Sequence, residues 1–274
     1  KKFALEKEAA KEADVIIEFV GIDTNTEREG KDKDSLAFPK EQLDLLKSVV
    51  GINKNVVAFV ISGSPLELGY LHENLMAVVQ AWYPGERGGD AIAALLAGDE
   101  NFSGKLPMTF FKSTSQLPPI SDYDLFKGRT YMYFDGDPQY EFGFGLSYTE
   151  FKYENFETQG VVFKKDDTIK YSVEIENVGP RDGEEIIEVY VKYKEAHGYE
   201  RAKLRLPNLQ LKDFKRVQLK KGEKKRVEGE IKISSIEFFE EKINQYVVLP
   251  GTLEILVGKS SKRIEFLQTI TILD

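Results

Sequence analysis

The chain has 274 residues, a formal net charge of -8, 41% hydrophobic and 31% charged residues, and no cysteine. Its length accommodates one large or two ordinary domains, and the lack of cysteine excludes disulfides, thiolate metal ligands and cysteine nucleophiles. The lysines are interleaved with acids, which gives no basic patch for nucleic acid, and no apolar run reaches the ~20 residues of a membrane span. We therefore expect neither a nucleic-acid nor a membrane partner.

The first residues read as a helix followed by a strand. Leu5, Ala9 and Ala13 fall on one face of a short helix rich in Glu and Lys. The apolar run at 15–20, closed by Gly21, predicts a strand.

A second helix and strand follow a long polar loop at 23–35. Pro39 suits the first turn of a helix, and Gly51 suits its end. Residues 56–61 are apolar at every position, which is typical of a parallel strand covered on both faces. The apolar positions of the predicted helix form its buried face: Leu43, Leu46, Val49 and Val50.

A glycine-rich turn at 81–91 joins a third strand to a third helix. The short apolar run from Leu75 to Val79 predicts a buried strand, and residues 91–97 have the spacing of a helix. The turn contains Pro84, Gly85, Gly88 and Gly89, so we expect its backbone either to adopt dihedrals that other side chains disfavour or to be approached closely. Residues 1–110 therefore predict an α/β domain with a parallel sheet.

The pattern changes after residue 110. Residues 111–149 are rich in Pro, Gly, Tyr and Phe and predict a connector packed by aromatic rings. From about residue 150 to 274 short strands alternate apolar and polar positions between turns, which is typical of an antiparallel β-sandwich. The inward positions include these: Tyr171, Val173, Ile175, Ile187, Val189, Val191, Tyr193, Val227, Ile231, Ile233, Leu253, Ile255 and Val257.

The glycine-rich turn begins a series of motifs. The segment AWYPGERGG at 81–89 is followed by GDENFSGKLPMTF at 98–110, by GRTYMYF at 128–134 and by YEFGFGLSYT at 140–149. In this order the motifs resemble glycoside hydrolase family 3, the β-glucosidases and β-xylosidases. Two departures are visible, because Glu86-Arg87 replaces the usual Gln-Glu and Phe102 stands where proline is common.

The resemblance implies an architecture and an activity. The chain is expected to hold an α/β three-layer sandwich with a mostly parallel sheet (residues 1–149), N-terminally incomplete, and an immunoglobulin/fibronectin III-like sandwich. Whole family members cleave β-linked glucose or xylose from non-reducing ends with retention. Their aspartate nucleophile lies in an N-terminal barrel, for which this chain has no room. We therefore expect the missing N-terminal segment of the same enzyme to be present elsewhere, for example as a separate chain, and this chain alone to be inactive.

The loop after the first strand is the candidate for catalysis. Ligands bind beyond the carboxyl ends of strands in open parallel sheets, and residues 23–34 lie there. This loop resembles the family's E-x-E-G-x-D-R loop, which supplies the acid/base glutamate. The match puts Glu29, just before Gly30, in that role, with Glu27 as the alternative, and Lys33 replaces the more usual arginine.

Other residues give weaker signals. Ser121-Asp122-Tyr123 superficially resembles the family's nucleophile motif but lies in the connector, so we interpret it as unrelated. His72 and His197 have no partner at metal-ligand spacing. Trp82 and Tyr83 are of the type that stacks on sugars, although core packing is favoured. The sequence indicates no metal and no nucleotide cofactor.

Two hypotheses remain from the sequence. The first is the C-terminal part of a retaining glycosidase acting on an oligosaccharide or aryl β-glycoside. The second is a non-catalytic carbohydrate-binding or scaffolding module. A glycosidase assay with and without Glu29 discriminates between them.

Overall fold

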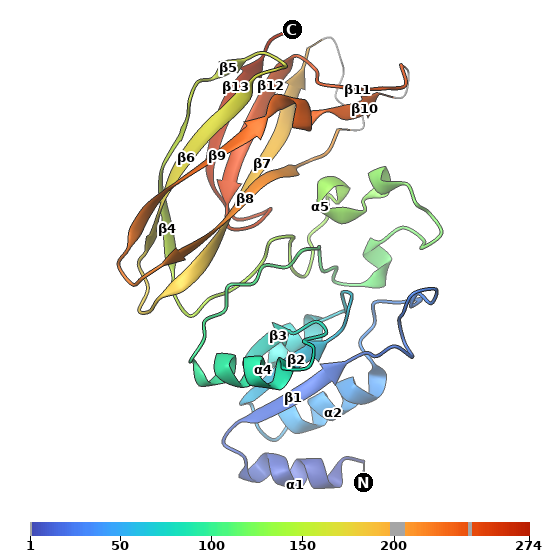
Figure 1. The fold of residues 1–274 in the computed structure, drawn as a ribbon. Coiled ribbons are helices and arrows are strands. Elements are labelled where there is room, and N and C mark those ends of the chain that lie inside the picture. The colour runs from blue at the N-terminus through green and yellow to red at the C-terminus, as the bar shows by residue number, and fades with distance from the viewer. Residues whose placement is uncertain (1, 198–205, 241–242) are drawn as a thin grey trace. The chain divides into compact units, whose positions relative to one another are not determined.

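The computed structural model describes residues 2–197, 206–240 and 243–274. The chain divides into two compact units (Figure 1). The domain boundaries expected at residues 110 and 149 stay a prediction. The units have these limits: unit 1 is Lys1–Leu96, Thr109–Tyr123 and Gly136–Tyr140; unit 2 is Ala97–Met108, Asp124–Asp135 and Glu141–Asp274.

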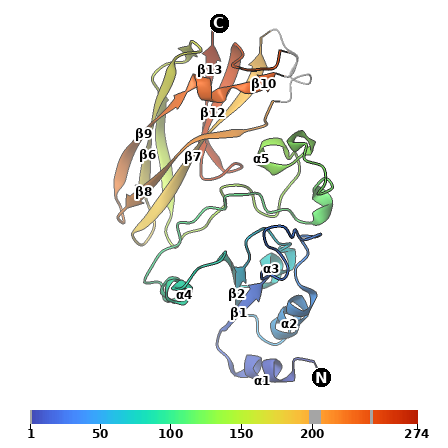
Figure 2. The ribbon, with the colours of Figure 1, turned by 45° about the vertical axis from the view of Figure 1, so that its right-hand side comes forward.

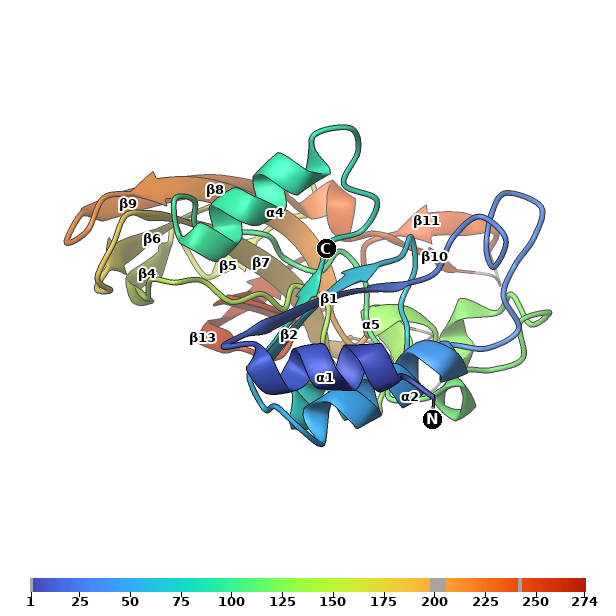
Figure 3. The ribbon, with the colours of Figure 1, turned by 90° about the horizontal axis from the view of Figure 1, so that it is seen from below.

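Unit 1 is built on a parallel sheet with the strand order β1-β2-β3. Figure 3 shows α1 and α2 on one side of this sheet and α4 on the other, so the expected α/β layering is confirmed. The elements that begin in unit 1 are α1 (Ala4–Glu12), β1 (Ile16–Gly21), α2 (Lys40–Val50), β2 (Val56–Ile61), α3 (Gly69–Asn74), β3 (Ala77–Gln80), α4 (Gly88–Ala97) and the short 3-10 helix η1 (Thr114–Gln116).

The central strand β2 has the limits that its apolar run predicted. Ala58 and Phe59 have no exposed surface, because β1 and β3 pair with both edges of β2 and helices lie on both sides of the sheet (Figure 3). Strand β3 differs from expectation, since it begins at Ala77 and is only partly buried. Within the described residues β3 has one neighbouring strand, and the preceding Met76 is 64% exposed.

Helix α1 packs through a different face from the one expected. Ala10 is buried, whereas Leu5 is 84% exposed. The amide of Asn53, beyond the end of α2, donates to the carbonyls of Ala10 (3.2 Å) and Ala13 (2.7 Å) and so ties the end of α1 to α2.

Strand β1 carries an exposed apolar strip. Val15, Ile17 and Phe19 are 52%, 43% and 59% exposed, respectively. They alternate along the chain and therefore share one face. The ring of Phe19 stacks on that of Phe59 in the neighbouring strand β2, at 5.5 Å between ring centroids.

Unit 2 contains an antiparallel β-sandwich, which confirms the expected second architecture (Figure 2). One sheet has the order β5-β13-β12-β7-β8 and the other β4-β6-β9. The predicted inward positions lie in its core, with Val173, Ile187 and Ile255 fully buried. The elements are the 3-10 helix η2 (Leu125–Lys127), α5 (Thr130–Tyr133), β4 (Phe151–Thr158), β5 (Val162–Phe163), β6 (Thr168–Asn177), β7 (Gly183–Ala196), β8 (Gln210–Leu219), β9 (Lys224–Lys232), the 3-10 helix η4 (Ile233–Ile236), β10 (Phe238–Glu240), β11 (Gln245–Val247), β12 (Gly251–Gly258) and β13 (Ile264–Ile272).

Parts of the motif-rich region pack within unit 2. The ring of Tyr131 stacks on Phe142 at 4.2 Å between centroids, and its hydroxyl accepts from the backbone N–H of Leu211 at 2.9 Å. Asn101 accepts from the hydroxyl of Ser147 and from the N–H of Tyr148. These contacts give the motifs a structural role beside the sandwich. No helix within the described residues is long and apolar enough to cross a membrane.

Candidate functional site

The carboxyl ends of β1, β2 and β3 meet at one rim of unit 1. Because the strands are parallel, the loops that follow them begin at the same edge of the sheet. Gly21, at the end of β1, has φ +142°, and a Cβ there would lie 1.9 Å from the carbonyl oxygen of Ile61. A glycine therefore allows β1 and β2 to end in close contact before their loops diverge.

The loop after β1 winds into a turn and then into a small hairpin. The backbone N–H groups of Thr26 and Glu27 both donate to the carbonyl of Asp23, at 3.0 and 3.1 Å. Arg28 and Lys31 then exchange two backbone hydrogen bonds, of 3.1 and 2.9 Å. The hairpin therefore begins immediately after Glu27.

Glu29 and Gly30 are the central residues of that hairpin turn. Gly30 has φ +72°, whereas Glu29 is not among the residues with positive φ. This combination is that of a type II turn, which requires glycine or asparagine at its second central position. Glu29 is exposed and, among the described residues, its side chain makes no hydrogen bond or ion pair. The turn therefore presents Glu29 outward with its carboxylate free.

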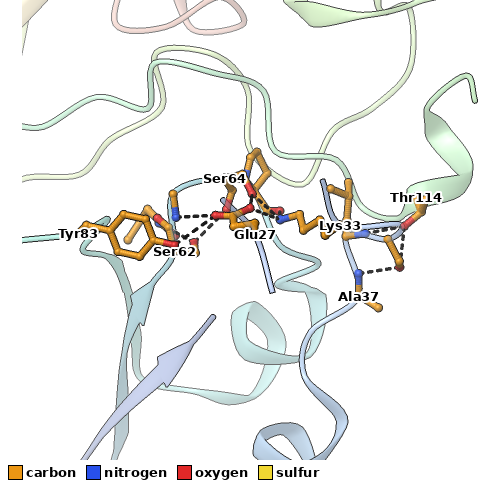
Figure 4. Close-up of polar contacts among 12 residues, drawn as sticks. Glu27, Lys33, Ala37, Ser62, Ser64, Tyr83 and Thr114 are labelled. Carbon is orange, nitrogen blue, oxygen red and sulfur yellow. Dashed lines mark hydrogen bonds and ion pairs between the residues drawn. The ribbon is translucent and has the colours of Figure 1, made fainter. Parts of the chain in front are cut away.

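Glu27, unlike Glu29, has several polar partners, which together form the Glu27 network (Figure 4). Its Oε1 accepts from the N–H of Gly63 at 3.0 Å and lies 3.4 Å from the hydroxyl of Tyr83. Its Oε2 accepts from the hydroxyl of Ser64 and lies 3.5 Å from Lys33 Nζ. The partners come from the loops after β1, β2 and β3, so Glu27 joins all three at the rim.

The electrostatics of this network keep Glu27 ionised. Burial acts to raise the pKa of Glu27, but the hydrogen bond from Ser64, the charge of Lys33 and the N–H of Gly63 outweigh it, so its pKa lies below the ordinary value. Burial lowers the pKa of Lys33, and the charge of Glu27 opposes this effect. The arrangement is therefore a partly buried ion pair with satisfied acceptors.

The other aromatic candidates divide between core and network. Trp82 is half-buried and its ring meets the buried Phe110 edge-on, with centroids 6.1 Å apart. Tyr83 is 52% exposed and belongs to the Glu27 network instead. Its ring also lies over Gly63, where a Cβ would come within 2.8 Å of Tyr83 Cε2.

The remaining candidates take no part in the hydrogen bonds and ion pair of this network among the described residues. His72 Nδ1 is 2.9 Å from the hydroxyl of Tyr140, in an aromatic cluster. His197 is exposed at the end of β7, and its backbone N–H donates to Pro250. Asp122 lies in a turn after Pro119, far along the chain from the loop. No group of His, Cys, Asp and Glu within the described residues has the geometry to hold a metal ion.

Sequence reasoning missed the partners of Glu27. No contact of Ser64 with Glu27 was expected, and Lys33 was noted only as a departure from arginine. The sequence signal for the contact of Ser64 with Glu27 is the position of each residue. Ser64 lies in the loop after β2, and Glu27 lies in the loop after the neighbouring parallel strand β1. Residues at equivalent ends of neighbouring parallel strands are candidates for mutual contact.

The fold and motifs agree with a family of carbohydrate-active enzymes. Residues 1–148 match the model of the glycosyl hydrolase family 3 C-terminal domain, and residues 185–261 match that of a fibronectin type III-like domain. The chain therefore belongs to glycosyl hydrolase family 3.

Particular relatives refine this assignment. The chain is 33% identical to a periplasmic β-glucosidase of Salmonella typhimurium over 270 residues, covering 94% of this chain and 34% of that protein. It is 37% identical to a xylan 1,4-β-xylosidase of Xylanibacter ruminicola over 235 residues, covering 85% of this chain and 26% of that protein. The structure of a β-glucosidase from Kluyveromyces marxianus in complex with glucose matches with a TM-score of 0.87 and 29% identity, over 98% of this chain and 33% of that one. The chain thus spans about a third of these relatives or less.

Proposed function

We propose that the chain is the C-terminal part of a retaining glycoside hydrolase that releases β-linked glucose or xylose from non-reducing ends. Its substrates are oligosaccharides or aryl β-glycosides. The catalytic nucleophile is an aspartate of an N-terminal barrel, in the same polypeptide or in a separate chain. This chain alone has no turnover, because it supplies only the acid/base.

We assign the acid/base role to Glu29. In the first step its carboxylic acid gives a proton to the glycosidic oxygen as the C–O bond breaks and the nucleophile bonds to the anomeric carbon. In the second step its carboxylate takes a proton from the water that displaces the nucleophile. Such a group needs a carboxylate free of internal partners and able to meet a sugar from outside.

The single observation that supports Glu29 is its place at the tip of the hairpin. It is exposed and unpaired among the described residues, whereas the alternative, Glu27, already accepts hydrogen bonds at both oxygens. The lowered pKa of Glu27 also makes it a poor proton donor near neutral pH. The exposed strip at Val15, Ile17 and Phe19 supports further polypeptide packing on β1.

The test uses the longer enzyme that contains this chain, with the phenyl and the nitrophenyl β-glucosides and β-xylosides as substrates; the phenyl glycosides have the poorer leaving group. Glu29→Gln is expected to lower kcat about 10²- to 10⁴-fold for substrates with poor leaving groups. Glu29→Ala with azide is expected to recover turnover and to form the β-glycosyl azide, because azide needs no general base. Unchanged activity in both variants would remove Glu29 from the mechanism.

A non-catalytic carbohydrate-binding or scaffolding module is the competing function. It requires sugar binding by the wild-type enzyme without any release of nitrophenol. Isothermal titration with glucose and xylose, run beside the kinetic assay, measures this outcome directly.

A further inference from the structure

The two legs of the Glu29 hairpin are attached to the same short segment after β2. Glu27, on the first leg, accepts from the N–H of Gly63 and from the hydroxyl of Ser64. Lys33, on the second leg, donates to the hydroxyl of Ser64 at 2.5 Å and to the carbonyl of Pro65 at 2.6 Å. The segment Gly63–Pro65 therefore holds both ends of the hairpin.

The attachment is shielded from water. The side chains of Glu27 and Lys33 are 16% and 12% exposed, and their charged groups are 3.5 Å apart. Ion pairs that are exposed on both sides contribute little to holding a loop, because water and salt screen them. A pair this enclosed, with hydrogen bonds to fixed backbone groups, restricts the geometry of both legs.

Little freedom remains between the two anchors. Residues 28–32 connect them, and Arg28 and Lys31 close the turn with two backbone hydrogen bonds. The guanidinium of Arg28 also donates to the carbonyl of Thr24 at 2.9 Å. The direction in which the turn presents Glu29 is thus fixed from both sides.

We propose that Glu27 and Lys33 form a positioning clamp that sets where Glu29 meets the substrate. This inference rests on the proposed role of Glu29 and gives Glu27 and Lys33 a positioning role and no contact with the reacting atoms. A displaced acid loses rate steeply, since a misplacement of about 1 Å costs on the order of 10²-fold. The clamp therefore acts on proton donation and not on sugar binding.

The test compares leaving groups in the longer enzyme. Glu27→Gln and Lys33→Met are expected to lower kcat/KM, which reports the first step, about ten-fold for a phenyl β-glycoside, whose leaving group needs protonation. They are expected to leave kcat/KM for the 2,4-dinitrophenyl β-glycoside almost unchanged, because that leaving group departs without an acid. A merely structural loss of folded enzyme lowers both rates by the same factor, so the ratio isolates positioning.

Conservative and combined variants sharpen the test. Lys33→Arg keeps the positive charge and is expected to retain most of the phenyl glycoside rate. The double variant Glu27→Gln/Lys33→Met is expected to lose no more than either single variant, because the two residues act as one unit. Asp90→Asn, at the start of α4, breaks an exposed ion pair with the preceding Arg87 and is the matched control with no expected effect.

The outcomes separate the clamp from the role of Glu29. In one outcome, Glu29→Gln loses far more rate with the phenyl than with the 2,4-dinitrophenyl glycoside, while Glu27→Gln and Lys33→Met behave as Asp90→Asn does. The clamp is then wrong, and the acid/base role of Glu29 is retained. If Glu29→Gln itself is unimpaired, the proposed function fails first. Formation of a glycosyl azide by Glu27→Ala, and not by Glu29→Ala, overturns both by making Glu27 the acid/base.

Discussion

Two enclosed carboxylates, one in each unit, show opposite electrostatics. Glu27 in unit 1 accepts from Gly63 and Ser64 and pairs with Lys33, and its pKa is lowered although burial acts to raise it. Glu188 in unit 2 is 4% exposed, and burial raises its pKa to about 7. Burial alone therefore does not decide protonation; the number of donors and cations facing the carboxylate does.

The environment of Glu188 explains its elevated pKa. The hydroxyl of Tyr190 donates to Glu188 Oε2, and the charge of Lys105 also favours ionisation. Glu185 and Glu141 act in the other direction, together with burial, the largest cause. Lys105 also forms an ion pair with Glu185, with Nζ 3.1 Å from Oε1. The charge of Lys105 therefore favours the ionised form of two buried carboxylates in unit 2, Glu185 and Glu188.

Removing Lys105 is expected to cause the largest loss of unfolding free energy. Lys105→Met leaves Glu185 and Glu188 without their cation, and breaking a buried pair in this way costs about 3–5 kcal/mol of unfolding free energy. Far-UV circular dichroism during urea unfolding measures the β-sandwich of unit 2. Fluorescence of Trp82, the single tryptophan and part of unit 1, is expected to report an unchanged transition.

An exposed pair in the same unit is the control. Arg216 and Glu184 are 2.9 Å apart, and their side chains are 56% and 33% exposed. Arg216→Met is expected to cost no more than about 0.5 kcal/mol. Equal losses in the two variants would contradict a special role of Lys105.

The next largest effect is expected in the pH dependence of the unfolding free energy of unit 2. Because the folded pKa of Glu188 lies near 7 and above the ordinary 4.5, the folded state holds a proton that the unfolded state releases between these values. The unfolding free energy therefore falls as pH rises from about 4.5 to 7, by roughly 3 kcal/mol for this group. Glu188→Gln keeps an acceptor for Tyr190 and is expected to lose this slope. An unchanged slope in the urea midpoint against pH would refute the raised pKa.

The sequence predicted the strands better than the networks. Strand β2 at residues 56–61 is apolar throughout, and periodicity detects such a pattern. The alternating strands of the β-sandwich were recognised for the same reason. Strand β3 was predicted as buried because its composition is apolar, but its burial depends on neighbouring strands, which a local pattern does not contain.

The sequence predicted where the loop of Glu27 and Glu29 begins but not the contacts that the two glutamates make. The rule for parallel sheets put the loop of Glu27 and Glu29 at the carboxyl rim. The different environments of the two glutamates depend on Ser64 and Tyr83, which are 37 and 56 residues from Glu27 in the chain. No local spacing connects residues so far apart, so only the fold distinguishes a held glutamate from a free one.

A smaller loss of unfolding free energy is expected from a substitution in the hairpin turn of unit 1. Gly30→Ala places a side chain at φ +72°, where nothing lies within 4 Å, so the cost is backbone strain of about 1 kcal/mol. Gly89→Ala is the control, because Gly89 also has open space but lies in α4 without a positive φ. Trp82 fluorescence during urea unfolding is expected to show a loss for the first and none for the second. Equal shifts would exclude strain at the turn.

The weakest contact of the Glu27 network gives the smallest expected effect. The hydroxyl of Tyr83 lies 3.4 Å from Glu27 Oε1, at the long limit for a hydrogen bond, and its ring is 52% exposed. Tyr83→Phe is therefore expected to change the unfolding free energy of unit 1 by less than about 0.5 kcal/mol, since water replaces the lost donor. Ser64→Ala removes the group that joins Glu27 to Lys33 and is expected to cost clearly more in the same Trp82 measurement. If Tyr83→Phe proved the more damaging of the two, Glu27 would be held chiefly by the loop after β3, and the attachment of both hairpin legs to Gly63–Pro65 would not be what fixes the turn.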